Sequence, residues 1–533
     1  MLAKVGFEGF QSFGLSQEID LAPLTLIFGP NSSGKSSVGR LLRLFAQSPS
    51  GGTGLVFSGG DVDLGSLAST AFRNDTKEGF TSKFFVIPLS RGVMVDKKTK
   101  RWIYVNAVNY ETFFADFDEG PVEIVRVGFA LYESREATAK RGDLEIVFAG
   151  VGDKFRLTRF SARGLRWLFE DVFGAGGLDS SPDIDFSPAN SFPTEASDEQ
   201  MSSNERVTFA FWDEDLQELR HAPAAEHLGK AEFYKTWGSI GMGRHERDGF
   251  IPKPNLAGSG PKDGFSAFLL DLLRKADREL ARHLGAFQYV GPLREITNGY
   301  VPRPSSVKKI RGDGSNLQQY LAAVSDESFD RIANDLELLT DGNFSLRKKQ
   351  IPFDVFEIGG QLQTVVFDNN SETDVTFGNS GAGLAQVLPI IAGIRGMSGL
   401  EFMEDEEHET ARKPPKGHFA GTLFIEQPEL HLHPRMQTNL VDFLLENTGT
   451  NGASVSRGEM PTVICETHSE SFLLRVQKRI RDGDYPPSKV AFYFVDRLPG
   501  SNSSYIDRME INDDGYFSRA WPLSFSELRN RER

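Results

Sequence analysis

The segment with the clearest capacity for chemistry is a glycine- and serine-rich turn close to the N-terminus. Its residues fit the pattern G-x-x-x-x-G-K-[ST] and are Gly29, Pro30, Asn31, Ser32, Ser33, Gly34, Lys35, Ser36 and Ser37. An apolar run at 24–28 precedes the turn, and a helical run at 38–45 follows it. Glycines let backbone N–H groups close around phosphate oxygens, Lys35 can reach the β- and γ-phosphates, and the Ser36 hydroxyl can coordinate Mg²⁺. We therefore expect this turn to bind a nucleoside triphosphate with Mg²⁺.

Two apolar, strand-like runs in the C-terminal half lead to further polar residues. The run at 422–425 is followed directly by Glu426, and the run at 462–465 leads after two residues to His468. In open α/β sheets, ligands bind outside the carboxyl ends of the strands. We therefore expect Glu426 to hold Mg²⁺ together with Ser36.

Composition restricts the class of protein that must position these groups. The chain has 533 residues, of which 39% are hydrophobic and 25% are charged, as in globular proteins of about three domains. No run approaches the ~18 apolar residues of a membrane span, and the first residues lack the apolar core of a secretory signal. The single cysteine, Cys465, excludes an intrachain disulfide and a cysteine-based zinc cluster. We expect a cytoplasmic protein with no membrane partner.

The charge balance bears on nucleic-acid binding. The formal net charge is −15, whereas nucleic acid is normally held by clustered lysine and arginine. Three local basic clusters are present, at Lys97–Arg101, Lys308–Arg311 and Arg347–Lys349. Such runs are usually solvated surface charges, but contact with DNA stays open as an alternative.

Patterning along the chain divides it into three parts. We expect residues 1–90 and 286–533 to form one nucleotide-binding unit of the α/β class, interrupted by an insertion at 91–285. Alternating apolar residues from about 83 to 160 predict antiparallel strands, and the spacing at Phe265–Leu284 predicts a helical arm. Residues 165–173 also have helical spacing, and the polar segment 174–205 has the composition of a linker.

Five segments together resemble the ABC-type ATPases of the AAA family. They are the turn at 29–37 and the segments 289–294, 379–389, 425–434 and 466–469. The similarity is greatest to the branch that contains overcoming-lysogenization-defect ATPases, Septu-type anti-phage ATPase subunits and RecF/SMC-like heads. It covers most of residues 1–90 and 285–533. The resemblance implies an ABC-type P-loop ATPase head, with a mixed or parallel core sheet and an antiparallel β subdomain, that uses ATP and Mg²⁺.

The resemblance also implies an assembly, a homodimer or higher homo-oligomer in which two subunits enclose two ATP molecules. Ser380, Gly381 and Gly383 match the signature segment, which opens a helix facing the γ-phosphate bound by the other subunit. Small residues, free N–H groups and the helix dipole suit that role. His468 matches the switch histidine that senses the γ-phosphate. The histidines at 431 and 433 match a dimer-facing loop, and without a third ligand they are weak evidence for zinc.

The resemblance leaves open which residues contact the γ-phosphate and which residue activates the attacking water. Gln288 and Arg294 belong to a segment near the nucleotide in these families, so either could contact the γ-phosphate or its water. Many ABC ATPases place a second acid directly after the Mg²⁺ carboxylate, but here that position is Gln427. An amide can orient a water but cannot accept its proton. Glu429 could supply the missing carboxylate, so Glu426, Gln427, Glu429 and His468 are the candidate catalytic residues.

Three functions compete for this chain. The first is the sensor or regulatory ATPase subunit of a bacterial anti-phage defence system, with a separate nuclease or toxin-like effector. The second is a RecF/SMC-like ATPase that binds DNA in repair or maintenance. The third is a self-contained nuclease, but the segment after His468 is too short for a Toprim domain, and Asn512–Gly515 has the composition of a hairpin turn. A transporter subunit is disfavoured, because the Leu-Ser-Gly-Gly-Gln signature is absent.

The glutamine at position 427 predicts slow ATP hydrolysis and a long-lived ATP-bound dimer. Replacing Gln427 by Glu should accelerate turnover, because a carboxylate can take the proton of the attacking water. Steady-state phosphate release from the purified chain measures the effect. Unchanged turnover in Gln427→Glu would move the catalytic role to Glu429 or elsewhere, and wild-type turnover of tens per second without a partner would contradict slow hydrolysis.

Overall fold

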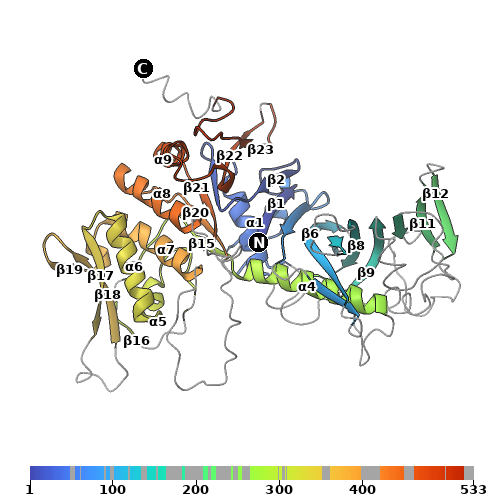
Figure 1. The fold of residues 1–533 in the computed structure, drawn as a ribbon, viewed down its shortest axis with the longest axis horizontal. Helices are drawn as coiled ribbons and strands as arrows, with labels where there is room; N and C mark the ends of the chain where they lie inside the picture. The colour runs from blue at the N-terminus through green and yellow to red at the C-terminus, as the bar shows by residue number, and fades with distance from the viewer. Residues whose placement is uncertain are drawn as a thin grey trace. The chain divides into compact units, whose positions relative to one another are not determined.

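The chain forms two compact units in a computed structural model of the protein (Figure 1). Unit 1 comprises Met1–Gln11, Gln47–Ser58 and Leu64–Arg282, and unit 2 comprises Ser12–Ala46, Gly59–Asp63 and His283–Arg533. The structure describes residues 1–48, 55–59, 62–88, 92–96, 101–117, 120–133, 141–151, 154–163, 183–186, 208–213, 218–223, 242–243, 250–251, 253–254, 264–297, 299–302, 307, 309–350, 361–397, 421–448, 461–498 and 500–520.

Unit 1 is built on an antiparallel sheet. Its strands, in their order across the sheet, are β12 (Glu218–Pro223), β11 (Thr208–Asp213), β10 (Asp183–Phe186), β9 (Lys154–Arg163), β8 (Arg141–Val151), β7 (Gly120–Tyr132), β6 (Arg101–Phe117), β4 (Phe80–Val86) and β1 (Leu2–Glu8). The short strand β5 (Gly92–Asp96) pairs with β6, and β13 (Met242–Gly243) pairs with β9 and with β14 (Lys253–Pro254). Buried and half-exposed residues alternate along β4, as the period of a strand with one covered face requires. The antiparallel strands predicted from 83 to 160 are confirmed.

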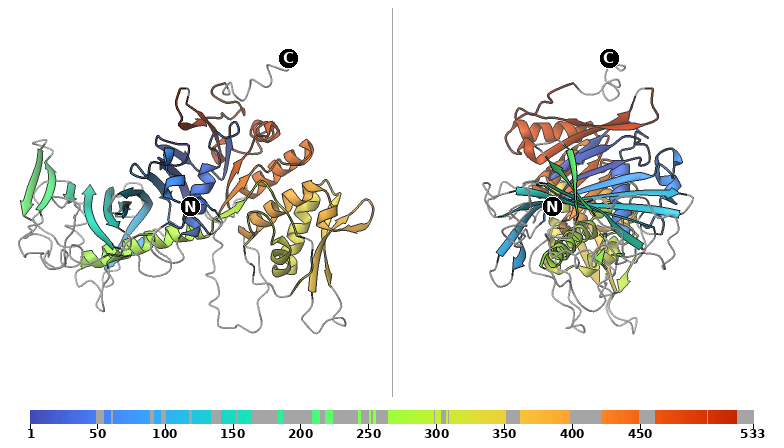
Figure 2. Two further views of the ribbon diagram at one scale, coloured as in Figure 1. Left: turned by 180° about the vertical axis from the view of Figure 1, so that it is seen from behind. Right: turned by 90° about the vertical axis from the view of Figure 1, so that its right-hand side faces the viewer.

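The long helix α4 (Gly264–Gly285) belongs largely to unit 1 and confirms the predicted helical arm. Figures 1 and 2 show it running alongside the antiparallel strands. Its apolar stripe, which includes Leu269, Leu272 and Leu273, is buried. The buried Asp277 carboxylate accepts hydrogen bonds from the backbone N–H groups of Phe250 and Ile251, at 2.7 and 3.1 Å. Polar contacts as well as apolar ones therefore fix the helix within unit 1.

Unit 2 contains a six-stranded sheet that is mostly parallel. Its order is β15 (Gln288–Val290), β20 (Thr422–Glu426), β21 (Thr462–Glu466), β3 (Leu24–Phe28), β22 (Val490–Arg497) and β23 (Ser504–Met509). The first five strands are parallel, and β23 returns antiparallel to β22. The short strand β2 (Gln17–Asp20) contacts β23. Every residue of β3 and of β21 is buried, as expected for strands covered on both faces.

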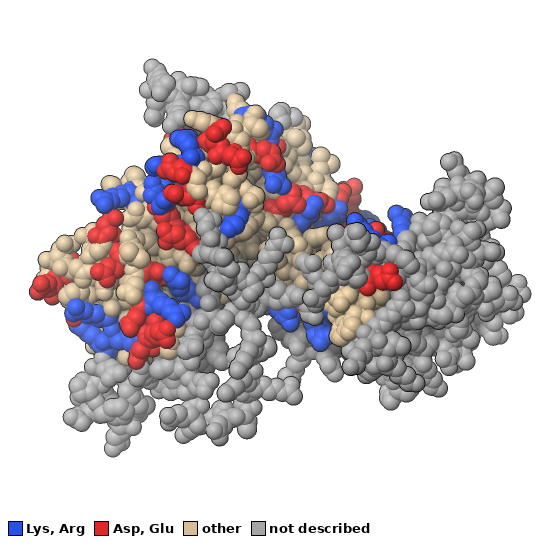
Figure 3. Space-filling view, viewed as in Figure 1, with Lys and Arg blue, Asp and Glu red and all other residues tan. Residues whose placement is uncertain are grey.

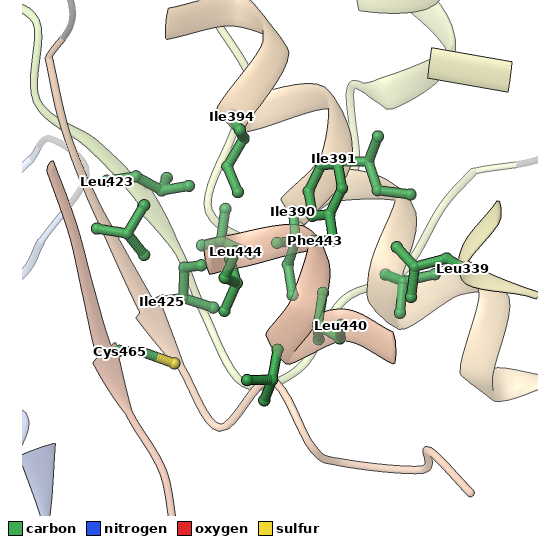
Figure 4. Close-up of a cluster of buried hydrophobic side chains, with 14 of the residues drawn as sticks. Leu339, Ile390, Ile391, Ile394, Leu423, Ile425, Leu440, Phe443, Leu444 and Cys465 are labelled. Atoms are coloured by element: carbon green, nitrogen blue, oxygen red, sulfur yellow. The ribbon is translucent and has the colours of Figure 1, made fainter. Parts of the chain in front are cut away.

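Helices cover both faces of this sheet. On one face, α7 (Ala382–Met397), α8 (Pro434–Thr448) and α9 (Glu470–Arg481) join Leu423, Ile425 and Cys465 of the strands in one apolar core. Figure 4 shows the part of this core where α7 and α8 meet the strands. On the other face, α1 (Ser37–Gln47) packs so closely that a side chain at Gly39 would meet the Phe424 ring at 2.6 Å. Successive side chains of a strand thus point to opposite faces of the sheet and pack against different helices.

A smaller antiparallel sheet flanks this core. It has the order β16 (Val301–Pro302), β18 (Gln361–Asp368) and β17 (Phe344–Gln350), with β19 (Thr373–Val375) also paired to β18. The helix α5 (Leu317–Ala323) is fixed to β18 by two hydrogen bonds between the Gln318 amide and the Thr364 backbone, at 2.9 and 3.0 Å. The helix α6 (Asp326–Leu339) is tied to α7 by the two hydrogen bonds from Arg395 to Asp335.

The remaining short elements include a predicted turn. Residues 512–515 form a turn closed by a 2.9 Å hydrogen bond from the Asn512 N–H to the Tyr516 carbonyl, and bridging residues 511 and 517 flank it. The other short helices are α2 (Leu67–Thr70), η1 (Phe72–Asn74), η4 (Phe377–Asn379) and η5 (Pro487–Lys489).

Some sequence expectations concern residues outside the described ranges. The predicted helix at 165–173 lies there, and so does the predicted linker at 174–205, apart from β10. Two basic clusters are only partly described, at Arg101 and at 309–311. Among the helices that the structure describes, none combines the length and the apolar character that crossing a membrane requires.

The core between the large sheet and α8 predicts a selective loss of stability. Leu444 is fully buried there (Figure 4), whereas Leu338 on α6 is 75% exposed. Leu444→Ala should lower the free energy of unfolding by about 2–5 kcal/mol, because it leaves a cavity among packed side chains. Leu338→Ala, the matched control, should change it by no more than about 0.5 kcal/mol. Urea unfolding measures both values, and equal losses in the two variants would contradict this packing.

Candidate nucleotide-binding site

The predicted phosphate-binding turn connects β3 to α1, as the motif requires. Two of its residues have backbone angles that favour glycine, with φ of 147° at Gly29 and 103° at Gly34. A side chain at Gly29 would come within 2.1 Å of the Val495 carbonyl, and one at Gly34 within 2.2 Å of the Ser12 hydroxyl. Glycine is therefore required at both positions by conformation and by space.

The Lys35 side chain is folded back over its own turn. Its ammonium group donates a hydrogen bond to the Pro30 carbonyl at 2.7 Å and lies 3.9 Å from a carboxylate oxygen of Glu466. Only 4% of Lys35 is exposed, and this burial lowers its pKa although Glu466 acts in the opposite direction. The lysine is thus positioned beside the turn by groups of the protein itself.

The neighbouring Ser36 makes the contact that links the turn to the centre of the sheet. Its hydroxyl donates a hydrogen bond to Glu466 at 2.7 Å. Glu466 ends β21, the strand next to β3, and is 4% exposed. Burial first and the nearby Glu426 second raise the pKa of Glu466 to about 7. The structure therefore adds to the site a buried carboxylate to which the sequence analysis assigned no role.

Glu426 ends the next strand, β20, and is aligned with Glu466 in the parallel register. Burial raises the pKa of its carboxyl group, although the nearby Tyr289 hydroxyl acts in the opposite direction. Its backbone carbonyl accepts a 2.6 Å hydrogen bond from Arg294. The predicted Mg²⁺ carboxylate therefore lies at the expected sheet edge, but Ser36 is bonded to a different glutamate.

The two candidates for the position of the attacking water have different surroundings. Gln427 has a φ of 45°, in the left-handed region, and its N–H donates to the Glu466 carbonyl at 2.8 Å. Glu429 accepts two hydrogen bonds of 2.8 Å, from the Thr467 hydroxyl and from the His468 N–H. The Glu429 carboxylate thus holds the segment that carries the histidine.

His468 follows β21 by two residues and is half-buried. Its Nε2 atom is buried and has no hydrogen-bond partner among the described residues. Burial, and secondarily the charge of Lys35, lower the pKa of this histidine, which favours the neutral ring. A neutral imidazole can donate or accept one hydrogen bond at this atom, depending on its tautomer.

The signature segment forms the start of α7. Its Ser380 hydroxyl donates to the Phe377 carbonyl at 2.8 Å, and Gly381 has a φ of 84°. Gly381 is exposed, and a side chain built there would meet nothing within 4 Å. One built at Gly383 would lie 3.3 Å from the His431 carbonyl. The helix start is thus open at Gly381 and packed at Gly383 against the loop that follows β20.

Arg294 connects this helix to the end of β20. It is 3% exposed and donates hydrogen bonds of 3.1 Å to the side chain and backbone oxygens of Gln386, besides its bond to Glu426. Burial lowers the pKa of Arg294 to about 10. Gln288 has a different environment, because a side chain at Gly393 of α7 would lie 3.6 Å from its Oε1 atom.

Two residues of this site, Glu466 and Tyr289, had no role assigned from the sequence, and the partners of Arg294 could not be assigned from it. The sequence analysis included Glu466 only as part of the segment 466–469. Its bond to Ser36 could not be predicted, because that bond depends on which strands are neighbours in the sheet. Tyr289 and Arg294 lie on the segment that the resemblance placed near the nucleotide, but their partners come from β20 and α7. The available signal was a polar side chain at the end of each apolar run.

The site suits Mg²⁺ only together with a bound phosphate. Hydroxyl and carboxylate oxygens such as those of Ser36, Glu426 and Glu466 are the ligands that this ion prefers. Among the described residues, however, no group of three or more His, Cys, Asp or Glu side chains is arranged to hold a metal ion. The protein would therefore hold Mg²⁺ through Ser36 and carboxylates, with phosphate and water completing the coordination.

Two of the three residues in the described basic cluster on β17 are paired with acidic residues of the same chain. Lys348 lies 2.7 Å from Asp326, and Lys349 lies 2.6 Å from Asp374. The Arg347 guanidinium lies 3.1 Å from the centre of the Phe367 ring. Figure 3 shows basic and acidic side chains interspersed on the visible face. This cluster therefore differs from the continuous basic surface that DNA binding normally uses.

Comparison with known proteins gives a family match and structural neighbours. Residues 294–475 match the family described as "AAA domain, putative AbiEii toxin, Type IV TA system". Among curated proteins, no sequence matches. The SMC head domain from Thermotoga maritima is 10% identical, with a TM-score of 0.33, over 96% of this chain and 99% of that chain. An Smc head domain from Pyrococcus furiosus, bound to the C-terminal domain of ScpA, is 11% identical, with a TM-score of 0.33, over 96% of each chain.

The family match covers the signature helix, β20 and β21, which are three of the elements that build the candidate site. The remaining part, the turn between β3 and α1, lies next to β21 in the sheet. Unit 2 therefore has an α/β fold in which a strand, a glycine-rich turn and a helix are arranged as in P-loop proteins, and residues 294–475 are similar to AAA domains.

Proposed function

We propose that this chain binds and slowly hydrolyses ATP, dimerises around it, and acts as the sensor or regulatory subunit of a bacterial anti-phage defence system. The effector, a nuclease or toxin-like protein, would be a separate chain. The observation that supports ATP use most directly is the grouping of Lys35, Ser36, Glu426 and His468 at one edge of the large sheet.

Each of these groups has a role that its chemistry permits. Lys35 would exchange its bond to the Pro30 carbonyl for the β- and γ-phosphates, and the glycines of the turn would present N–H groups to the same oxygens. Ser36 and Glu426 would hold Mg²⁺, which offsets charge on the phosphates when it is bound. The free Nε2 atom of His468 would bond to the γ-phosphate.

Gln427 would orient the attacking water through its amide. Because an amide cannot accept a proton, this arrangement supports slow turnover. Glu429 already accepts two hydrogen bonds that fix the histidine segment, so its proposed contribution is to position His468. Slow hydrolysis would make the ATP-bound state long-lived, which suits a regulatory subunit better than a motor.

Dimerisation is supported by the open start of α7. Free N–H groups at a helix start attract anionic phosphate, and the exposed Gly381 allows close approach. In the proposed dimer, Ser380, Gly381 and Gly383 of one subunit face the γ-phosphate held by the other.

The defence role rests on the family resemblance, and the description of the matched family, which names a toxin of toxin–antitoxin systems, accords with it. A RecF/SMC-like role with bound DNA is the alternative. The paired charges at Lys348 and Lys349 argue against DNA binding at that surface.

The proposed dimer predicts a variant that binds ATP but does not assemble. Ala382, the first residue of α7, is exposed, so Ala382→Arg should leave the subunit folded but obstruct the partner. Asn334→Arg, at an exposed position of α6, is the control with the same change of charge. Light scattering in Mg²⁺-ATP should find dimers of wild type and of the control, and monomers of Ala382→Arg and Lys35→Ala. A wild type that stays monomeric in ATP, or an Ala382→Arg dimer, would contradict the assembly.

The regulatory role predicts a stoichiometric protein partner. The tagged chain, purified from its native host in Mg²⁺-ATP, should retain a nuclease or toxin-like protein that mass spectrometry identifies. Lys35→Ala, which should lose ATP, is expected to lose that partner. Recovery of DNA without a protein partner would instead support the RecF/SMC-like alternative.

A further inference from the structure

Glu466 occupies a position between the two parts of the ATP site that the sequence defines. Its strand, β21, lies between β3, which leads into the phosphate-binding turn, and β20, which ends at Glu426. In the parallel register, Glu466 is aligned with Glu426 on one side and with Ile27 on the other. Because these strands end at the same edge, its carboxylate is directed at the turn and not at the core.

The two carboxylates at this edge of the sheet, Glu466 and Glu426, have different polar neighbours. Glu466 accepts the Ser36 hydroxyl at 2.7 Å and lies 3.9 Å from the Lys35 ammonium. The polar neighbour of the Glu426 carboxylate is instead the Tyr289 hydroxyl, which acts to lower the pKa of Glu426. The residue bonded to the Mg²⁺-binding hydroxyl is therefore Glu466, although Glu426 directly follows the apolar run that defines the carboxylate motif.

A carboxylate buried to 4% exposure needs compensation for the water it has lost. Glu466 has one hydroxyl donor and one ammonium group at the edge of ion-pair distance. ATP would draw Lys35 toward its phosphates, so this compensation would decrease just as further negative charge arrives. A divalent cation beside Ser36 would restore the balance, because carboxylates and phosphates are both ligands that it prefers.

We propose that Glu466 is a positioning residue for the Mg²⁺ ion of the ATP site, acting through Ser36 and through water bound to the ion, and that it makes nucleotide binding strongly dependent on Mg²⁺. This inference rests on the proposed function, since it concerns the cation that accompanies ATP. Without the ion, the Glu466 charge opposes the phosphates. With the ion, the same charge favours the complex.

The test is the ratio of nucleotide affinities with and without Mg²⁺. A fluorescent ATP analogue is titrated into the full chain, once in EDTA and once in excess Mg²⁺. In Glu466→Gln, the amide can still accept the Ser36 hydroxyl, but the charge is gone. We expect affinity in EDTA to rise, and the enhancement by Mg²⁺ to fall by about tenfold or more, as with other groups that orient bound ions.

Two variants serve as controls. Glu466→Asp keeps the charge and should retain more of the Mg²⁺ enhancement than Glu466→Gln. Glu470→Gln removes an exposed charge four residues along the chain and should match wild type. The inference is overturned if Glu466→Gln keeps the wild-type enhancement, or if it loses affinity equally in EDTA and in Mg²⁺, as a purely structural role would produce. A wild type that binds no nucleotide in either condition would instead contradict the proposed function itself.

Discussion

The hydrogen-bonded alignment of β3, β21 and β20 is the constraint on which the candidate site depends. Neighbouring strands lie about 4.8 Å apart, so three parallel strands that end together bring their following residues within reach of one another. The phosphate-binding turn, Glu466 and Glu426 follow from these three strands in that order. Their separation along the chain has no bearing on the result, because the sheet joins them.

The same alignment places two carboxylates side by side in a buried environment. Burial raises the pKa of Glu426 and of Glu466, and the two charges disfavour each other. Such an arrangement lowers the stability of the protein alone, and sites that bind ligands commonly accept this cost. The nearby cations do not fully offset this electrostatic cost, since Lys35 is itself buried and its pKa is lowered.

The sequence was sufficient for features that depend on local pattern. The spacing around Lys35 predicted a strand, a turn and a helix, and β3 and α1 confirm it. The apolar runs before Glu426 and before His468 predicted β20 and β21, and the stripe along α4 predicted that helix. These features follow from side-chain type and period within a few residues.

The sequence could not predict which side chains from different strands and helices form hydrogen bonds with one another. The bond from Ser36 to Glu466 needs β21 to lie beside β3, and no local pattern specifies strand order. The contacts of Arg294 likewise need α7 and β20 to meet. The basic run on β17 illustrates the same limit, because its acidic partners at 326 and 374 come from other elements.

Cys465, the only cysteine of the chain, lies beside Glu466 on the central strand β21 and is fully buried (Figure 4). Burial also raises the pKa of its thiol, so the reactive thiolate is scarce. In the folded protein, Cys465 should therefore react only slowly with thiol reagents. A cysteine introduced at the surface can carry a probe without removal of the native one, and labelling of Cys465 itself reports opening of the sheet centre.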